Sequence, residues 1–224
     1  MATMCGRFTQ FGPWSDIQNL YRLTLEADRA RNTAPRYNIS PTQDVLFVHL
    51  DGEGRQVVDE GRWWLVPFWA KEMPKFAMFN ARSEDADKKP AFREAFKSKR
   101  CLIPADGFYE WTKAEDGQKD PWFIHLPDNA TFSFAGLWAH NDNLGVTSCT
   151  ILTTAAEEPV SELHNRMPII LAPAAYDAWL DPETPVKDAK DLLGQNLDGQ
   201  LTFHRVGRQV NSSRYQGADA ISKI

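Results

Sequence analysis

The sequence predicts a single α+β domain in which a curved or barrel-like mixed β-sheet carries peripheral helices. Strand-like apolar runs outnumber segments with helical spacing, which favours a fold built mainly on sheet. No internal repeat, low-complexity segment or linker divides the chain. Its 224 residues, of which 42% are hydrophobic and 25% charged, are enough for one substantial domain with its own core. The pattern leaves the order of the strands open.

Helical spacing occurs in four segments. In the first, which follows Pro13, apolar residues lie three or four positions apart from Trp14 to Tyr21. In the second, which contains Pro90, Phe92 and Phe96 are four residues apart. Proline is tolerated in the first turn of a helix, and this spacing places apolar side chains on one face. We therefore predict helices over residues 14–25, 89–98, 173–180 and 186–193.

Strand-like runs fill most of the remaining chain. They are short apolar segments separated by Gly and Pro, which are typical of turns. The predicted strands cover residues 44–50, 56–65, 76–82, 101–104, 107–112, 121–126, 131–138, 147–154 and 201–206.

Charge is unevenly distributed along the chain. The net charge of −5 argues against a protein covered in positive potential for nucleic acid. Residues 71–100, however, hold nine Lys and Arg against five Asp and Glu, and residues 199–224 hold four against one. A local basic groove on an acidic body could hold a short stretch of phosphate backbone. Charge taken alone also fits an ordinary solvated face.

The cysteines and histidines give no sign of a disulfide framework or a metal site. The three cysteines are an odd number without a Cys-x-x-Cys pair, which favours a reducing, cytosolic compartment. Cys101 and Cys149 lie in apolar runs, so we expect them to be inert core residues. His49, His125 and His140 occur singly, unlike paired zinc ligands. We expect no metal and no cofactor. Without a signal pattern or an apolar stretch of about 18 residues, we also expect no membrane association.

Cys5 has distinctive chemistry because it directly follows Met4. Removal of Met4 would give Cys5 an α-amino group and a thiol on adjacent carbons. The amine can condense with an aldehyde, and the thiolate can then close a thiazolidine ring on the same carbon. In model compounds the amine has a pKa of about 7.7–8.0 and the thiol about 8.5, so both are partly nucleophilic near neutral pH. Alternatively, Cys5 is one more small buried residue, as most free cysteines are.

Four short stretches contain polar residues within strand-like apolar sequence. Each is a weak signal by itself, since a lone Glu between aromatic residues is usually at the rim of a core and a lone His before Asn usually lies in a turn. The stretches are Cys5-Gly6-Arg7-Phe8, Phe79-Asn80-Ala81-Arg82-Ser83-Glu84, Pro104-Ala105-Asp106-Gly107-Phe108-Tyr109-Glu110-Trp111 and Leu163-His164-Asn165-Arg166-Met167-Pro168.

Together, and in this order and spacing, the four stretches resemble the SRAP family, the SOS-response-associated peptidase-like proteins that cross-link to abasic sites in single-stranded DNA. The resemblance covers nearly the whole chain. Supporting stretches are Arg36-Tyr37-Asn38-Ile39-Ser40-Pro41, Trp63-Trp64-Leu65-Val66-Pro67-Phe68-Trp69, Thr153-Thr154-Ala155-Ala156 and the segment from Arg205-Val206 to Val210-Asn211.

The resemblance implies four catalytic residues. Cys5 would be the nucleophile, and Asn80 would hydrogen-bond the cysteine amine and the sugar. Glu110 would be a general acid and base beside the Schiff base, in keeping with aromatic neighbours that favour a raised carboxyl pKa. His164 would donate the proton that opens the deoxyribose ring, as suits an imidazole near pH 7.

The same resemblance implies a DNA-binding surface. Arginines offer forked donors to phosphates, and flat aromatic side chains stack on bases. The implied phosphate ligands are Arg7, Arg82 and Arg166, and the implied stacking residues are Trp69 and Trp111. The expected partner is therefore single-stranded DNA with abasic sites, bound by a cytoplasmic monomer that is nucleoid-associated when on DNA.

Two other functions fit parts of the pattern. A cysteine peptidase acting on other proteins would use Cys5, Glu110 and His164 but would not need a free amine. A non-catalytic single-stranded DNA-binding module would need the aromatic residues and arginines but would tolerate loss of the Cys5 thiol.

The first four residues depart from the family pattern, in which the cysteine follows the initiator Met directly. Here Ala2-Thr3-Met4 intervene, so the Cys5 nitrogen is an amide, which cannot form a Schiff base. We therefore expect residues 1–4 to be a leader that is either not translated, because synthesis starts at Met4, or removed by self-cleavage, and residues 5–224 to form the SRAP domain.

Overall fold

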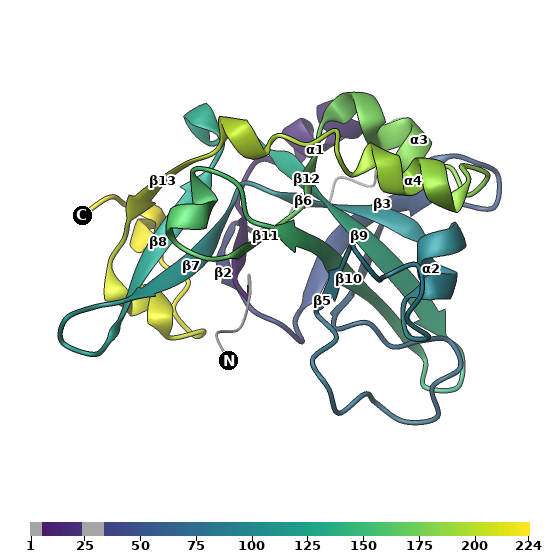
Figure 1. Ribbon diagram of the computed structural model, residues 1–224, viewed down its shortest axis with the longest axis horizontal. Helices are drawn as coiled ribbons and strands as arrows, with labels where there is room; N and C mark the ends of the chain where they lie inside the picture. Colours follow the sequence, from purple (N-terminus) through teal and green to yellow (C-terminus); the bar gives the residue numbers. More distant parts are fainter. Residues whose placement is uncertain (1–5, 24–33) are drawn as a thin grey trace.

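The computed structural model describes residues 6–23 and 34–224 and shows a β-rich fold with short helices at its periphery (Figure 1). The α-helices are α1 (Trp14–Tyr21), α2 (Arg93–Ser98), α3 (Tyr176–Leu180) and α4 (Val186–Leu192). The strands are β1 (Phe8–Gln10), β2 (Arg36–Ile39), β3 (Asp44–Leu50), β4 (Gln56–Trp63), β5 (Asn80–Arg82), β6 (Arg100–Ala105), β7 (Gly107–Lys113), β8 (Lys119–His125), β9 (Phe132–Asn141), β10 (Val146–Ala155), β11 (Arg166–Pro168), β12 (Ile170–Leu171) and β13 (Thr202–Arg205).

Five strands close into a barrel. The order is β10-β4-β3-β6-β9, and β9 pairs again with β10 to complete the ring. All of these pairings are antiparallel except the parallel contact between β10 and β4. Beyond β4, the second half of β10 pairs in parallel with β5 and antiparallel with β11. The prediction of a curved or barrel-like mixed sheet in one α+β domain is confirmed.

Alternating side chains on the barrel strands fill two separate cores. Along β3, Val45 and Phe47 belong to the cluster that also contains Trp63 and Phe134. The intervening Leu46 and Val48 belong instead to the cluster formed with the helices. Successive strand residues point to opposite faces, so both faces of β3 are covered. This explains why the sequence is continuously apolar from Val45 to Val48.

A second sheet has the order β13-β8-β7-β1-β2. Phe108 on β7 packs in the same core cluster as the barrel residues, whereas Tyr109 packs on the other face with Val210 and Ala220 of the C-terminal segment. This sheet therefore lies between the barrel and the C-terminal segment.

The helix predictions are correct in place but too long in two cases. The helix predicted over 14–25 ends at Tyr21, because Arg22 has a left-handed φ of 50° and the Leu23 N–H donates to the Gln18 carbonyl; residues 24 and 25 lie outside the described residues. The helix predicted over 89–98 begins only at Arg93, after a series of turns. For 173–180, a 3₁₀ turn precedes α3, and α4 matches 186–193 to within one residue.

The strand predictions miss only short segments. The strand predicted over 44–50 agrees with β3 in both bounds, but the one predicted over 76–82 shortens to Asn80–Arg82. Strands β1, β2, β11 and β12 have two to four residues each, too few for alternation to be visible in the sequence. Of these, β11 lies within one of the four polar stretches, β1 begins at the last residue of another, and β2 lies in a supporting stretch of the family resemblance.

Cys101 and Cys149 are free and fully buried, as expected of core residues. Burial raises the pKa of both thiols, so neither is a reactive thiolate. Within the described ranges, no helix is long and apolar enough to span a membrane.

Candidate functional site

The first described residues lie against β7. Phe8 is paired with Phe108, and the Tyr109 N–H donates to the Arg7 carbonyl at 3.0 Å, so the antiparallel pairing continues beyond the end of β1. The same register brings Gly6 opposite Glu110. The amino end of the described chain is therefore adjacent to the predicted acid and base.

Glu110 is buried, with 2% of its surface exposed. Because side chains alternate along β7, it points to the same side as Phe108, toward the barrel, and its neighbour Trp111 points to the opposite side. Trp122 is directly opposite Glu110 on β8. A carboxyl group at this depth beside the amino end of the described chain is a candidate for proton transfer.

Arg7 is held by the protein and stacks near Trp111. Its guanidinium donates to Asn38 Oδ1 at 2.8 Å and to the carbonyls of Val210 at 2.9 Å and Asn211 at 3.4 Å. The guanidinium carbon lies 5.6 Å from the centre of the Trp111 ring, whose Nε1 donates to Asn211 Oδ1 at 2.6 Å. Burial lowers the pKa of Arg7, but an arginine remains charged. Arg7 thus presents a fixed rather than a mobile positive charge.

Arg7, Trp111 and Asn211 line a pocket of about 730 Å³, here called the Arg7 pocket. It joins five parts of the chain: the amino end, the segment after β2, the residue before β5, the hairpin of β7 and β8, and the C-terminal segment. Its lining residues are Gly6, Arg7, Ser40, Pro41, Thr42, Gln43, Phe79, Trp111, Gln118, Lys119, Asn211 and Ser213. Phe79 immediately precedes Asn80, so the pocket also reaches the start of β5.

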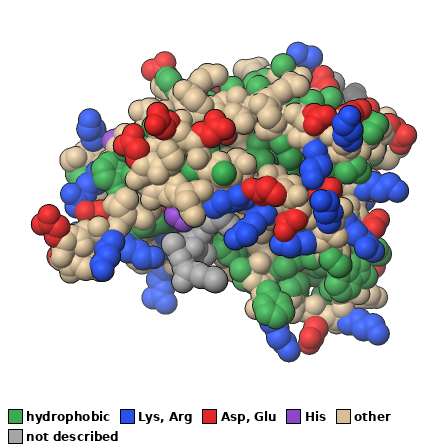
Figure 2. Space-filling view, viewed as in Figure 1, with side chains coloured by type: hydrophobic (Ala, Val, Ile, Leu, Met, Phe, Trp, Pro, Cys, Tyr) green, Lys and Arg blue, Asp and Glu red, His purple; other side chains and the backbone are tan. Residues whose placement is uncertain are grey.

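A second group of predicted site residues lies where β5 and β11 flank β10. Asn80 is opposite Ile151 and Arg82 is opposite Thr153, while Arg166 is opposite Ala155. Arg82 is exposed, and within residues 6–23 and 34–224 it forms no ion pair. Its charge is therefore available to a ligand. Lys and Arg side chains gather over the region of β5 and α2, with Asp and Glu among them (Figure 2).

Arg166 is paired with Glu84. Its guanidinium forms a two-pronged ion pair with the Glu84 carboxylate, in which Nη2 lies 2.9 Å from Oε2, and Nη2 also donates to the Thr153 carbonyl at 2.8 Å. The hydrogen bond from Arg166 lowers the pKa of Glu84. A phosphate that contacts Arg166 would therefore compete with Glu84 or share the guanidinium with it.

The backbone of Arg166 orients His164. The His164 Nδ1 atom lies 3.1 Å from both the backbone nitrogen and the carbonyl oxygen of Arg166. In a neutral ring, Nδ1 accepts the Arg166 N–H, so the proton is on Nε2; in a charged ring, Nδ1 donates to the carbonyl and Nε2 is also protonated. Nε2 is a proton donor in both states.

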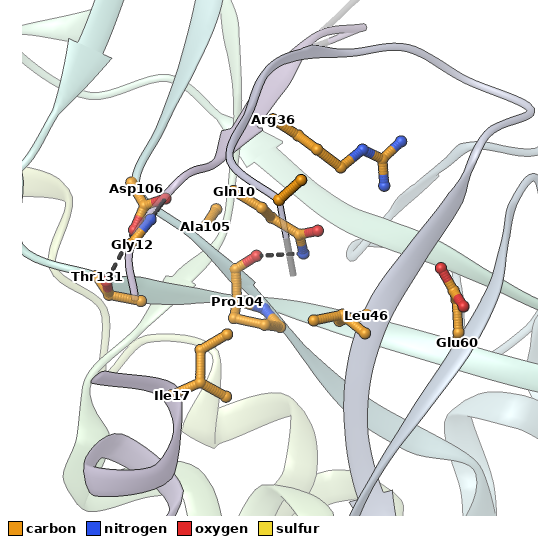
Figure 3. A pocket seen from close by; sticks show the side chains of 11 residues that line it. Gln10, Gly12, Ile17, Arg36, Leu46, Glu60, Pro104, Ala105, Asp106 and Thr131 are labelled. Atoms are coloured by element: carbon orange, nitrogen blue, oxygen red, sulfur yellow. Dashed lines mark hydrogen bonds between the residues drawn. The ribbon is translucent and has the colours of Figure 1, made fainter. Parts of the chain in front are cut away.

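A smaller pocket, of about 220 Å³, contains none of the predicted site residues (Figure 3). Asp106 lies on its wall and accepts hydrogen bonds from the N–H groups of Phe11 and Gly12 and from the Thr131 hydroxyl. Gln10 donates to the Pro104 carbonyl at 2.8 Å. These polar groups are already paired within the protein, so they secure the chain between β1 and α1.

Comparison with known proteins decides the family. The family model described as SOS response associated peptidase (SRAP) matches residues 4–213. The chain belongs to the SRAP family.

Relatives within the SRAP family match over almost the whole chain. It is 36% identical over 223 residues to the abasic site processing protein YoaM of Bacillus subtilis, covering 97% of both chains. It is 30% identical to the abasic site processing protein YedK of Escherichia coli, covering 99% of this chain and all of YedK. Among solved structures, a phage-related protein of Bordetella bronchiseptica superposes with a TM-score of 0.76 at 29% identity, covering 95% and 99% of the two chains.

The residues that the SRAP resemblance implied fall into two neighbouring groups and one separate position. The first group lies at the amino end of the described chain and consists of Arg7, Trp111 and Glu110. The second group lies around β10 and consists of Asn80, Arg82, His164 and Arg166. Trp69 is 53% exposed and lines a different pocket, with Trp138 and Lys99, rather than the Arg7 pocket. Cys5 lies outside the described residues.

Three polar residues of the site were not singled out from the sequence. Asn38 accepts a hydrogen bond from Arg7, and Asn211 accepts one from Trp111. Glu84 forms the ion pair with Arg166. Each occurs in a stretch that carried the family resemblance, so an asparagine or glutamate inside such a stretch was the available signal. In the described part of the chain, no three His, Cys, Asp or Glu side chains are grouped to hold a metal ion.

Proposed function

We propose that this protein recognises abasic sites in single-stranded DNA and forms a covalent thiazolidine cross-link through Cys5, which shields the lesion. Its SRAP relatives YoaM and YedK are named abasic site processing proteins. The observation that supports the proposal most is the register of the first described strand, which brings Gly6, a lining residue of the Arg7 pocket, opposite the buried Glu110. Cys5 precedes Gly6 in the sequence, so we propose Glu110 as the carboxyl that serves its amine and thiol.

The chemistry begins with the closed form of the abasic sugar. His164 donates a proton from Nε2 to the ring oxygen O4′, the C1′–O4′ bond breaks, and the C1′ hydroxyl loses its proton to water, which gives the aldehyde. The Cys5 amine then forms a bond to C1′, and Glu110 protonates the departing hydroxyl, which leaves as water to give the imine. The Cys5 thiolate adds to C1′, its thiol proton passing to the imine nitrogen. The ring therefore contains new C1′–N and C1′–S bonds, and one water is released overall.

The remaining residues would position the DNA. Asn80 would hydrogen-bond the Cys5 amine and the sugar. Arg82 is an exposed cation that would contact a phosphate, and the Trp111 ring on the wall of the Arg7 pocket would stack on a base. Trp69 would reach DNA only at the edge of the surface, on the loop between β4 and β5, whose exposed apolar residues are Phe68, Trp69, Met73 and Phe76.

The cross-link needs a free Cys5 amine, so residues 1–4 must be absent from the active protein. We propose synthesis from Met4 followed by removal of that Met. The alternative is attack of the Cys5 thiolate on the Met4 carbonyl, which moves the acyl group from nitrogen to sulfur before water, assisted by Glu110, releases the leader. That route would give the peptidase description of the family a self-cleaving meaning.

The proposal is tested with an oligonucleotide that carries one abasic site. Incubation followed by a denaturing gel should give a stable shifted band with the wild-type protein and none with Cys5→Ala or Cys5→Ser. The same lesion in a duplex should react more slowly, because stacking requires unpaired bases. Intact-mass spectrometry identifies the first residue of the reacting species.

Four outcomes would contradict the proposal. A band that persists in Cys5→Ala would exclude the thiol, and binding without any band would indicate a single-stranded DNA-binding module. A stable cross-link formed by a species that retains residues 1–4 would exclude the aminothiol mechanism. Cleavage of unrelated proteins that depends on Cys5 would support a general cysteine peptidase instead.

His164 should accelerate ring opening without contributing to affinity. Replacing His164 by Gln keeps a hydrogen-bonding side chain but removes the exchangeable imidazole proton, so we expect cross-linking to slow by about 10²-fold, a typical contribution of a general acid. Binding to intact single-stranded DNA, measured by fluorescence anisotropy, should change less than twofold. An equal loss of binding and cross-linking would make His164 a DNA-contacting or structural residue.

A further inference from the structure

Asn38 is the buried link between the amino end of the described chain and the C-terminal segment. It lies on β2 with none of its surface exposed. Its Oδ1 accepts the 2.8 Å hydrogen bond from Arg7 Nη1. Its Nδ2 lies 3.1, 2.9 and 3.0 Å from the carbonyl oxygens of Val210, Ser212 and Tyr215. One side chain therefore joins segments that are more than 200 residues apart in sequence.

The chemistry of this position requires an amide. Three carbonyl oxygens surround Nδ2 and can only accept hydrogen bonds, while the Arg7 guanidinium beside Oδ1 can only donate. An amide group satisfies both sides because it has a donor and an acceptor at its two ends. Aspartate would satisfy Arg7 but would turn an oxygen toward the three carbonyls, and an apolar residue would satisfy neither side.

The segment that Asn38 holds forms one wall of the Arg7 pocket. The 3₁₀ helix η6 (Arg208–Asn211) and the turns that follow it supply the lining residues Asn211 and Ser213. The Val210 carbonyl that binds Asn38 also accepts from Arg7, so the three groups form a closed triangle of hydrogen bonds. Gln216 adds a hydrogen bond of 2.9 Å to the Asn38 carbonyl from the exposed side.

We propose that Asn38 is a positioning residue for the cross-linking site. By fixing Arg7 on one side and the segment 210–215 on the other, it sets the amino end of the chain opposite Glu110 and the shape of the pocket beside it. The effect of Asn38 on cross-linking rests on the proposed function. The anchoring of the segment 210–215 by Asn38 does not, and it can be tested without DNA.

The first test uses Asn38→Asp, Asn38→Ala and Gln216→Ala. Asn38→Asp keeps the acceptor for Arg7 and removes the donor, and Asn38→Ala removes both. Gln216→Ala leaves the Asn38 side chain in place and removes the donor to the carbonyls of Asn38 and Ser213. Amide hydrogen exchange over residues 207–217 should become about tenfold faster in the two Asn38 variants and rise measurably in Gln216→Ala, since the segment loses anchoring bonds. Unchanged exchange in variants that fold would overturn the proposal. If neither Asn38 variant folds, the Asn38 Nδ2 protons of the wild type decide the outcome by NMR: slow exchange supports the anchoring role, and fast exchange overturns it.

The second test measures single-turnover cross-linking to an abasic oligonucleotide at saturating and limiting concentrations. Asn38→Asp should lower the maximal rate by about 10–10²-fold, as expected for reacting groups displaced by about 1 Å, and change the half-saturating concentration much less. Arg100→Lys is the matched control, because it weakens a buried hydrogen-bond network that does not line the Arg7 pocket. Its folded fraction should react at the wild-type rate.

The outcomes separate the two proposals. If the wild-type protein fails to cross-link while exchange in the Asn38 variants rises, the proposed function is wrong but the anchoring role of Asn38 stands. If the wild type cross-links and Asn38→Asp reacts at the same maximal rate, Asn38 does not position the site. Equal rate losses in Asn38→Asp and Arg100→Lys would indicate general destabilisation and would also overturn the proposal.

Discussion

Replacing Asp198 by Asn should increase the free energy of unfolding by about 4 kcal/mol above pH 7 and leave it almost unchanged below pH 4. Asp198 is 1% exposed, and in the described chain neither of its carboxylate oxygens has a hydrogen-bond partner. Burial raises its pKa to about 7, and the negative charge of Glu157 acts in the same direction. A difference of roughly three pKa units corresponds to about 4 kcal/mol at 1.36 kcal/mol per unit.

The direction of this pH dependence follows from the state, folded or unfolded, in which Asp198 loses its proton at the lower pH. The carboxyl ionises near pH 4 in the unfolded chain but near pH 7 in the folded protein, so the folded state binds more protons between these values. The folded protein therefore loses stability as the pH rises from about 4 through 7, relative to its stability below pH 4. An Asn side chain does not ionise, so Asp198→Asn should remove this slope.

Urea unfolding of wild type and variant at several values between pH 4 and pH 8 measures the effect. The difference in free energy between the two proteins should grow across this range. Asp142→Asn is the matched control, because the Asp142 side chain is 99% exposed and its contact with His140 should contribute little. A difference that stays constant with pH would show that Asp198 titrates at its ordinary pKa.

Replacing Arg100 should destabilise the fold severely, because its side chain joins two helices through the interior. Arg100 is 2% exposed, and its guanidinium donates only to backbone carbonyls. Its partners are the carbonyl oxygens of Phe96 and Lys97 at the end of α2, Trp179 and Asp181 at the end of α3, and Thr184 beyond it. Carbonyl groups at helix C-termini carry partial negative charge, so one buried cation joins two helix ends.

We expect Arg100→Met to lower the free energy of unfolding by about 3–5 kcal/mol, because it leaves several buried carbonyls without donors. Arg100→Lys should cost less, about 2–3 kcal/mol, since an ammonium group keeps the charge but cannot reach both helix ends. At about 2–4 °C per kcal/mol for a chain of this size, the Met variant should melt roughly 10 °C lower.

Calorimetry and urea unfolding check the prediction, with Lys97→Met as the control. Lys97 is on the same helix but exposed, so its loss should change stability by no more than about 0.5 kcal/mol. Equal effects of Arg100→Met and Lys97→Met would mean that the carbonyls find water or other donors once the guanidinium is gone.

Local patterns determined much of the architecture. The apolar run from Val45 to Val48 predicted β3, and the predicted bounds 44–50 are those of the strand, because the centre of a strand buried on both faces is apolar at successive positions. The cysteines of apolar runs are inert core residues for the same reason. The sequence also carries enough information to identify the family, since four polar stretches in a fixed order and spacing are together specific to SRAP.

The tertiary structure alone decided how these pieces meet. No local feature of β10 says that it pairs in parallel with β4 and β5 while closing the barrel through β9, because those partners are chosen by packing across the whole chain. Asn38 reads in the sequence as one polar residue of a short motif, and its hydrogen bonds go to residues 31 and 172–177 positions away. Nothing in the local sequence distinguishes Asp198 from an exposed turn residue, yet in the fold it is 1% exposed. Whether a segment forms a strand depends largely on its neighbours along the chain. Burial and hydrogen-bond partners depend on neighbours in space, and the order of residues in the sequence does not say which residues those are.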